Sequence, residues 1–335
     1  MSEKRLKREI LKKYIQYYGA KSPTYNTINN FRQPIIRRLC KAAFWTKKII
    51  SMYIRDDGSC RKLIHSQWRR EAFAWLPQFE VVITTRCSLR CKYCSNLMQY
   101  YNEPYDVPVD IIKDSFIRLM SICDHVGDVI PIGGEPFLCR NFSELLKFFL
   151  GFSKIDRVVI FTNGTIAIRD EELLILLADP RVTLKISDYG FGNVKEFCKK
   201  MDEHNVNYTL FTEDRTWRDD GDLKPRFRNN EELKQQFNRC ASPCRSLLNG
   251  QLHFCPRSGH GTDLGLIPLQ PNDYLDFMDA RQPVSKMQLL EFYFRTQPIT
   301  ACDYCDSGTY EQRKVYKAGS EQLSKPYNLN NPTEA

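Results

Sequence analysis

Between residues 79 and 211 the sequence alternates short β-rich runs with helical patterns, and this alternation constrains the fold more than any other feature. The β-rich runs are Phe79–Thr84, Val126–Ile132, Arg157–Phe161, Val182–Ser187 and Asn207–Phe211. The helical patterns between them are Val109–Ile122, Phe142–Phe149, Glu171–Ala178 and Val194–Glu203. Strands that alternate with helices in this way lie parallel and are joined by right-handed crossovers. The pattern predicts an α/β fold that binds its ligands at the C-terminal ends of the strands.

The cysteine content separates this chain from disulfide-stapled proteins. No apolar run of about 18 residues is present and the N-terminus is charged throughout, so we expect a cytoplasmic protein. Thiols stay reduced in that compartment. The chain has 13 cysteines in 335 residues, an odd number that is high for such a protein. Clustered thiols in a reducing compartment indicate metal or iron–sulfur ligands.

The basic character of the chain is concentrated in an N-terminal extension, residues 1–76. Residues 1–75 contain 18 Lys and Arg against 5 Asp and Glu, whereas the whole chain has a net charge of +9. Helical patterns cover Met1–Tyr18 and Pro34–Ile54, and the second has a basic sector opposite an apolar one. The favoured interpretation is a helix docked on the main domain with a solvated basic stripe. The alternative is peripheral contact with a membrane or a phosphorylated substrate. Nucleic acid is not an expected partner.

The first motif with chemical meaning is a loop of three cysteines directly after the first predicted strand. Cys87, Cys91 and Cys94 have the spacing C-x3-C-x2-C. Three thiolates hold three irons of a cubane cluster and leave the fourth iron without a protein ligand, which is the open position that chemistry requires. Zinc is the alternative metal, but a fourth Cys or His at zinc-knuckle spacing is missing.

A second motif, Gly133-Gly134-Glu135-Pro136, ends the next strand. Paired glycines allow a ligand to approach the backbone closely. A carboxylate beside them is suited to bind an ammonium group. The sequence therefore predicts a second binding element at the same edge of the sheet as the cysteines.

These two motifs, in this order, resemble the signature of the radical S-adenosylmethionine (SAM) superfamily, including the aromatic Tyr93 before the last cysteine. The resemblance implies a partial (β/α) barrel of five to six parallel strands over residues 77–216. It further implies a SAM-cleaving [4Fe–4S] cluster on the three cysteines and SAM bound by the Gly-Gly-Glu motif. The residues expected to bind SAM are Tyr93, Gly133, Gly134, Glu135, Asn163 and Ser187.

A third group of cysteines follows the alternating region. Its members are Cys240, Cys244, Cys255, Cys302 and Cys305. Asn249–Gly250 predicts a type I′ hairpin turn that sets Cys244 opposite Cys255, with both thiols on one face. The spacing indicates a metal site, for which an iron–sulfur cluster and a structural zinc are both suitable.

This third group resembles the SPASM/twitch extension of radical SAM enzymes, here over residues 217–319. The single-cluster twitch form matches the number of cysteines better than the two-cluster SPASM form. The resemblance implies an auxiliary [4Fe–4S] cluster. Four ligands suffice for it, so either Cys240 or Cys244 is spare. The polar residues 320–335 are expected to form a disordered tail.

The resemblance implies an enzyme that cleaves SAM reductively to a 5′-deoxyadenosyl radical and abstracts hydrogen from a substrate. We expect oxidation of a carbohydrate or cyclitol, anionic or neutral, with an external electron donor such as flavodoxin or ferredoxin. Such oxidation needs a base for the second proton. The main candidates are Asp188 and Asp219, and Asp220 and Lys185 are further candidates. A peptide-modifying radical SAM enzyme and a non-enzymatic zinc-binding module are the alternatives.

Overall fold

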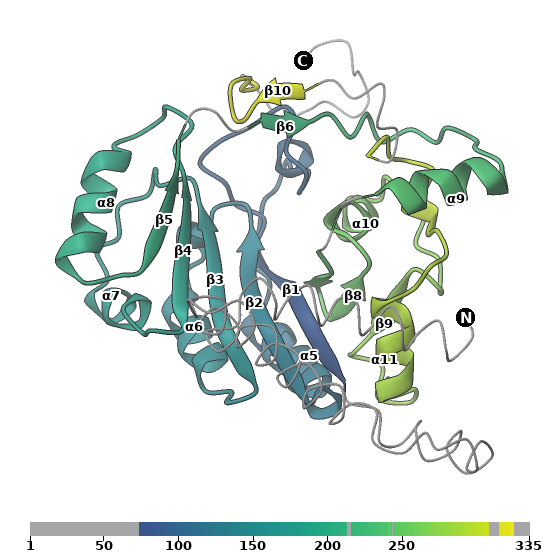
Figure 1. The fold of residues 1–335 in the computed structure, drawn as a ribbon, viewed down its shortest axis with the longest axis horizontal. Coiled ribbons are helices and arrows are strands. Elements are labelled where there is room, and N and C mark those ends of the chain that lie inside the picture. Colours follow the sequence, from purple (N-terminus) through teal and green to yellow (C-terminus); the bar gives the residue numbers. More distant parts are fainter. Residues whose placement is uncertain (1–73, 213–215, 241, 243, 308–314, 325–335) are drawn as a thin grey trace, which may run out of the picture.

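An eight-stranded sheet forms the centre of the molecule (Figure 1). The computed structural model describes residues 74–212, 216–240, 242, 244–307 and 315–324. The strand order is β5-β4-β3-β2-β1-β7-β8-β9. The first five strands are β1 Trp75–Thr84, β2 His125–Gly133, β3 Ile155–Thr162, β4 Val182–Ser187 and β5 Tyr208–Phe211. The predicted helices of the N-terminal extension, and the membrane contact proposed for them, lie outside the described residues.

Strands β1 to β5 are all parallel and each pairs with the next along the chain. β1 also pairs in parallel with β7, Ser246–Leu248. Six adjacent strands therefore run in one direction, while β5 stands at an edge of the sheet. The arrangement confirms the predicted α/β fold with a largely parallel sheet, in the form of a partial barrel.

The crossover helices lie along one side of this sheet (Figure 1). They are α5 Val109–Ile122, α6 Phe142–Leu150, α7 Glu171–Leu177 and α8 Val194–Glu203. Side chains cap the N-termini of α7 and α8. Asp170 accepts hydrogen bonds from Glu172 N and Leu173 N, and Asn193 accepts one from Glu196 N. Such caps satisfy amides that have no partner within the helix. The bounds predicted for α5 and α8 match those in the structure, and the bounds predicted for α6 and α7 differ by one residue at the C-terminal end.

The C-terminal region extends the same sheet instead of forming a separate one. The β7–β8 hairpin, with β8 Gln251–His253, turns at Asn249 and Gly250, whose φ angles of 49° and 83° confirm the predicted type I′ turn. β9 Tyr274–Asp276 completes the sheet, and three α-helices belong to this region of the described chain (Figure 1). These helices are α9 Asn230–Arg239, α10 Pro256–Asp263 and α11 Lys286–Tyr293.

A second, two-stranded sheet joins β6, Thr216–Arg218, to β10, Val315–Lys317, in antiparallel register. Figure 1 shows this pair above the C-terminal ends of the parallel strands. The chain then continues through Gly319–Ser324, which bonds to the three-cysteine loop. The prediction of a disordered tail is therefore wrong for residues 320–324, because those backbone hydrogen bonds hold them, and residues 325–335 lie outside the described part.

Within the described part of the chain, no helix has both the length and the apolar character needed to cross a membrane.

The core between the sheet and its helices is built around Phe116 of α5, which is 0% exposed. Its ring centroid lies 5.8 Å from that of Phe79 on β1, 4.9 Å from Phe149 on α6 and 5.1 Å from Phe152. Aromatic rings at these separations combine a large buried area with favourable ring–ring contacts. Phe116 therefore connects the first strand to two crossover helices.

We expect Phe116→Ala to lower the free energy of unfolding by about 3–5 kcal/mol, the range for a buried aromatic truncated to alanine. The neighbouring Ile117, 49% exposed on the same helix, provides the matched control. Ile117→Ala should change stability by roughly 0.5 kcal/mol or less, as surface substitutions do. Chemical denaturation of both variants measures the difference, and equal losses would contradict this description of the core.

Candidate active site

The three cysteines lie in one loop that leaves the C-terminal end of β1. Hydrogen bonds from Cys94 N to Cys91 O (3.2 Å) and from Leu97 N to Cys94 O (3.1 Å) fold the loop back on itself. All three line a cavity of about 570 Å³. Burial raises the pKa of Cys87 to about 12 and that of Cys91 to about 11. Such thiols lose their protons only when a strong positive partner, such as iron, binds them. The donor set therefore fits a cluster with one open iron.

The paired glycines bring the end of β2 against the start of this loop. A Cβ on Gly133 would stand 1.8 Å from Thr84 O, and one on Gly134 would stand 2.0 Å from Arg86 O. In their place, Gly134 N donates to Thr84 O at 3.0 Å and Glu135 N donates to Arg86 O at 2.8 Å. The structure shows a close approach at both glycines, and the group that approaches is the backbone at the start of the cysteine loop, whereas the sequence predicted a ligand there. Both glycines also line the cavity, where SAM is expected.

Glu135 is 1% exposed and lines the cavity. Its carboxylate accepts hydrogen bonds from Thr162 Oγ1 and Asn163 N, each at 2.8 Å, so it connects the ends of β2 and β3. Burial raises its pKa to about 7 although these hydrogen bonds act in the opposite direction. A cationic amino group in the cavity would favour the ionised carboxylate.

The other residues expected to bind SAM divide into two groups. Asn163 and Ser187 line the cavity at the ends of β3 and β4, and Asn163 Nδ2 donates to Ser88 Oγ of the cysteine loop at 3.0 Å. Tyr93 is not among the lining residues. Its ring stacks on Tyr316 of β10, with centroids 3.8 Å apart and planes at 14°. The side chain of Tyr93 thus faces the C-terminal segment.

Cys240, Cys244, Cys255 and Cys305 line the same cavity as the three-cysteine loop. Burial raises the pKa of Cys302 to about 12, and charge repulsion from Cys305 and Cys240 adds to this effect. Burial also raises the pKa of Cys255, with repulsion from Cys302, Cys305 and Cys240. Cys240, Cys255, Cys302 and Cys305 are therefore close enough to act on one another, and Cys255 also raises the pKa of Cys244.

Cys244 has a different environment. Burial raises its pKa, and the next largest cause is Glu80 on β1. Gln78 Nε2, from the same strand, donates a long hydrogen bond of 3.9 Å to Cys244 Sγ. Of Cys240 and Cys244, which the sequence left as alternatives, Cys244 is the one directed toward the sheet.

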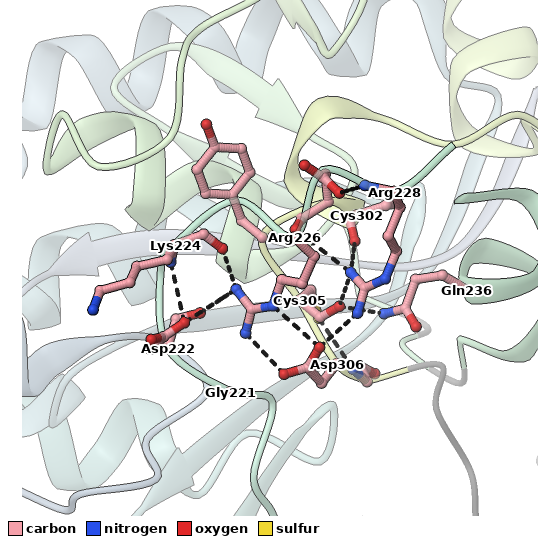
Figure 2. A network of polar contacts seen from close by, with 12 residues as sticks. Gly221, Asp222, Lys224, Arg226, Arg228, Gln236, Cys302, Cys305 and Asp306 are labelled. Atoms are coloured by element: carbon pink, nitrogen blue, oxygen red, sulfur yellow. Dashed lines mark hydrogen bonds and ion pairs between the residues drawn. The ribbon is translucent and has the colours of Figure 1, made fainter. Parts of the chain in front are cut away.

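Arginines hold the loop between Cys302 and Cys305 (Figure 2). Arg228 Nη1 donates to Cys302 O at 3.1 Å and to Cys305 O at 2.9 Å, while Arg228 Nη2 contacts Asp306 at 2.6 Å. Gln236 Nε2 donates to Cys305 O at 2.7 Å. These bonds fix the backbone that carries both thiols, which prepares the loop to bind a metal centre without further ordering.

Among the described residues, no three His, Cys, Asp or Glu side chains converge as ligands of a single metal ion. In a cubane each cysteine binds a different iron, so the sulfurs lie apart around the cluster.

The inner face of the sheet contributes polar residues that the sequence reasoning did not single out. Gln78, Asp128 and Arg157 stand in one register row across β1, β2 and β3 and line the cavity. Arg157 Nε and Nη2 donate to Asp128 Oδ1 at 2.9 and 2.7 Å, and the Asp128 side chain is 3% exposed. Glu80 lies two residues beyond Gln78, accepts a hydrogen bond from Ser246 Oγ, and has its pKa raised by burial. Charged residues inside otherwise apolar strands were the signal available in the sequence.

The two aspartates considered as bases do not reach this cavity. Asp188 Oδ1 accepts a hydrogen bond from Gly190 N, and Asp219 Oδ1 accepts one from Gly221 N, each at 2.9 Å. Each carboxylate stabilises the turn that follows it, which is a common role for aspartate. Lys185 and Asp220, the other candidates, do line the cavity.

The model of the Radical SAM superfamily matches residues 81–209, from β1 to β5. This segment is a radical SAM superfamily domain, as its motifs predicted. The match supports a [4Fe–4S] cluster and SAM as the cofactors of the domain. It ends before Cys240, so the auxiliary cluster remains a prediction.

Two curated relatives match a similar length of the chain. The GTP 3′,8-cyclase of Syntrophomonas wolfei subsp. wolfei is 31% identical over 140 residues, which are 39% of this chain and 40% of that protein. The GTP 3′,8-cyclase of a Synechocystis species is 28% identical over 125 residues, 34% of this chain and 33% of the relative. The chain thus spans two fifths or less of the length of these relatives.

Among solved structures, BtrN in complex with AdoMet and 2-DOIA aligns over 69% of this chain and 93% of its own, with 15% identity and a TM-score of 0.47. Streptococcus suis SuiB bound to S-adenosylmethionine aligns over 52% and 45%, with 16% identity and a TM-score of 0.34.

We expect Glu135→Gln to weaken SAM binding by about 1.5–3 kcal/mol, the range for a hydrogen bond to a charged group. The wild-type affinity should also fall roughly five- to tenfold between pH 7.5 and pH 6, because the carboxylate takes up a proton as the pH drops through its pKa. The glutamine variant should lose this pH dependence. Calorimetric titration of cluster-loaded protein tests both effects.

Glu203→Gln, at the exposed end of α8, is the control and should bind SAM as the wild type does. Unchanged affinity in Glu135→Gln at both pH values would remove Glu135 from the SAM site.

Proposed function

We propose that this chain is a radical SAM enzyme that oxidises a small, polar, hydroxyl-rich substrate. The observation that carries the proposal is that one and the same cavity is lined by cysteines of both groups and by charged side chains of the sheet. When bound, SAM and the cluster supply a 5′-deoxyadenosyl radical that takes a hydrogen atom from the substrate. The protein's own residues bind and orient the reactants around that chemistry.

The upper part of the cavity suits SAM. Glu135, Asn163 and Ser187 come from the ends of three neighbouring strands, next to the three cysteines. In α/β folds, ligands bind at this end of the strands. A substrate placed deeper in the cavity would then meet the inner face of the sheet.

That inner face suits a polar substrate. The Asp128–Arg157 pair is held in the cavity wall, with the Asp128 side chain 3% exposed and the Arg157 side chain 34% exposed. Burying a charge such as that of Asp128 costs more than burying an apolar residue of the same volume. Glu80, whose pKa is raised by burial, lies in the same wall. These groups offer both donors and acceptors to hydroxyl groups, so a carbohydrate or cyclitol is the class favoured here.

A nucleotide is the second candidate substrate, because the curated relatives are GTP 3′,8-cyclases. Arg157 and Lys185 line the cavity and would suit phosphate groups. Release of 5′-deoxyadenosine in the presence of GTP, but not of sugars or cyclitols, would favour this candidate over the first. The external electron donor, of the flavodoxin or ferredoxin class, is part of either proposal.

For the auxiliary centre we propose Cys240, Cys255, Cys302 and Cys305 as the ligands of a [4Fe–4S] cluster. Charge repulsion from Cys240 acts on Cys255, Cys302 and Cys305, which supports the choice of Cys240. Arg228 and Gln236 hold two of them in place through backbone carbonyls. Cys244 is then the spare thiol, which lies toward Glu80.

Anaerobically reconstituted protein should contain about eight irons, four in each of two cubanes. Replacing Cys87, Cys91 and Cys94 together by Ala should leave about half of that iron and abolish 5′-deoxyadenosine formation, because the SAM-cleaving cluster has lost its ligands. Iron analysis and chromatography of the nucleoside product are the measurements. Stoichiometric zinc with no iron-dependent absorbance would contradict the proposed function and favour a zinc-binding module.

The ligand assignment is tested by two matched variants. Cys240→Ser should lose about four irons while still cleaving SAM without productive turnover. Cys244→Ser should keep both clusters, since its thiol is not a ligand in this proposal. The reverse result would show that Cys244 is the ligand and Cys240 the spare residue.

A further inference from the structure

The C-terminal segment Gly319–Ser324, here called the strap, lies across the three-cysteine loop. Cys91 and Gln322 form an antiparallel bridge. On either side of it, Lys92 N donates to Glu321 O and Leu323 N donates to Arg90 O, each at 2.9 Å. A segment more than 220 residues away in the chain is thus paired with the backbone that carries a cysteine of the cluster loop.

The side chain of Gln322 is held in one orientation. Its Oε1 accepts a hydrogen bond from Arg90 N at 2.7 Å, and a backbone N–H requires an acceptor at that position. Its Nε2 must therefore face the opposite way, where it donates to Cys91 Sγ at 3.0 Å and to Gly319 O at 2.8 Å. The amide N–H thus points at a sulfur because the rest of the side chain is already fixed.

Contacts outside the bridge fix the strap itself. Tyr316, just before it, stacks on Tyr93. A Cβ on Gly319 would stand 2.6 Å from Tyr189 Cγ, so the backbone at that position packs directly on the ring. Lys92 Nζ contacts Glu321 at 3.0 Å. The donor to Cys91 is therefore part of a packed segment with several attachment points.

We propose that Gln322 is a positioning residue that raises the reduction potential of the cluster held by Cys87, Cys91 and Cys94. The inference rests on the proposed function, in which these thiols bind that cluster. Reduction adds one negative charge to the cluster and its thiolates. A hydrogen bond to a ligating sulfur strengthens as that charge grows, so it stabilises the reduced state more than the oxidised one.

The test is a redox titration followed by EPR spectroscopy on the full chain with its clusters reconstituted. Gln322→Glu keeps an acceptor for Arg90 N but removes the donor to Cys91. At a fixed solution potential, its ratio of reduced to oxidised cluster should fall about tenfold, which for one electron is a midpoint about 59 mV lower. Gln322→Met, which removes the amide and keeps the size of the side chain, should also lower the midpoint.

Ser320→Ala is the matched control within the strap, because that exposed hydroxyl donates only to Lys317 O among the described contacts. Its midpoint should equal that of the wild type. Equal midpoints in the wild type and both Gln322 variants would overturn the inference.

A higher midpoint in the Gln322 variants would also overturn it, since detachment of the strap exposes the cluster to water, which favours the more charged reduced state. A wild-type protein with no iron–sulfur EPR signal would contradict the proposed function itself, so the two failures are distinguishable.

Discussion

The pairing of β1 on both of its edges is the constraint on which the arrangement of the site depends. On one side β2 runs parallel to it, and the Gly133–Gly134 backbone packs against the start of the three-cysteine loop. On the other side β7 runs parallel to it and brings the cysteine-bearing hairpin. One strand therefore positions the three-cysteine loop, the Gly-Gly-Glu motif and cysteines of the second group around a common cavity. A shift of either register would move these groups apart.

The cavity wall contains polar groups whose burial lowers the stability of the fold, and this cost indicates that they have a function. Asp128 and Glu80 are buried carboxyl groups inside a sheet whose other inward residues include Ile130, Ile132 and Val159. Apolar residues would be at least as stable at such positions. Retaining charges there is consistent with a surface that recognises a polar molecule. The paired glycines also lower stability, because a glycine loses more conformational entropy on folding than other residues do. At these positions the absence of a Cβ permits the close backbone contact.

Much of this fold follows from local sequence patterns. Helices α5 and α8 have the bounds that their apolar periodicity predicts, and Asn249–Gly250 makes the turn that its residue types require. The three cysteines and Glu135 also line one cavity, because motifs at the ends of parallel strands meet at one edge of the sheet.

The remaining features depend on contacts between distant segments, which no local pattern encodes. The parallel pairing of β7 with β1 joins residues 166 apart in the sequence, such as Glu80 and Ser246. In the sequence, the end of the strand–helix alternation and the spacing of the cysteines made residues 217–319 look like a separate region. The Asp128–Arg157 pair arises only when β2 and β3 lie in register. Polar composition also suggested disorder for residues 320–324, whose order comes from their bonds to the cysteine loop and from turn contacts with Lys317 and Gly319.

We propose two iron–sulfur centres at one cavity, one in the loop after β1 and the other among the cysteines around the β7–β8 hairpin. Anomalous diffraction at the iron edge, from crystals of anaerobically reconstituted protein, tests this proposal most directly. The account predicts two separate iron peaks, one within bonding distance of Cys87, Cys91 and Cys94 and the other among Cys240, Cys255, Cys302 and Cys305. A single iron peak, or a second peak that appears only at the zinc edge, would contradict it.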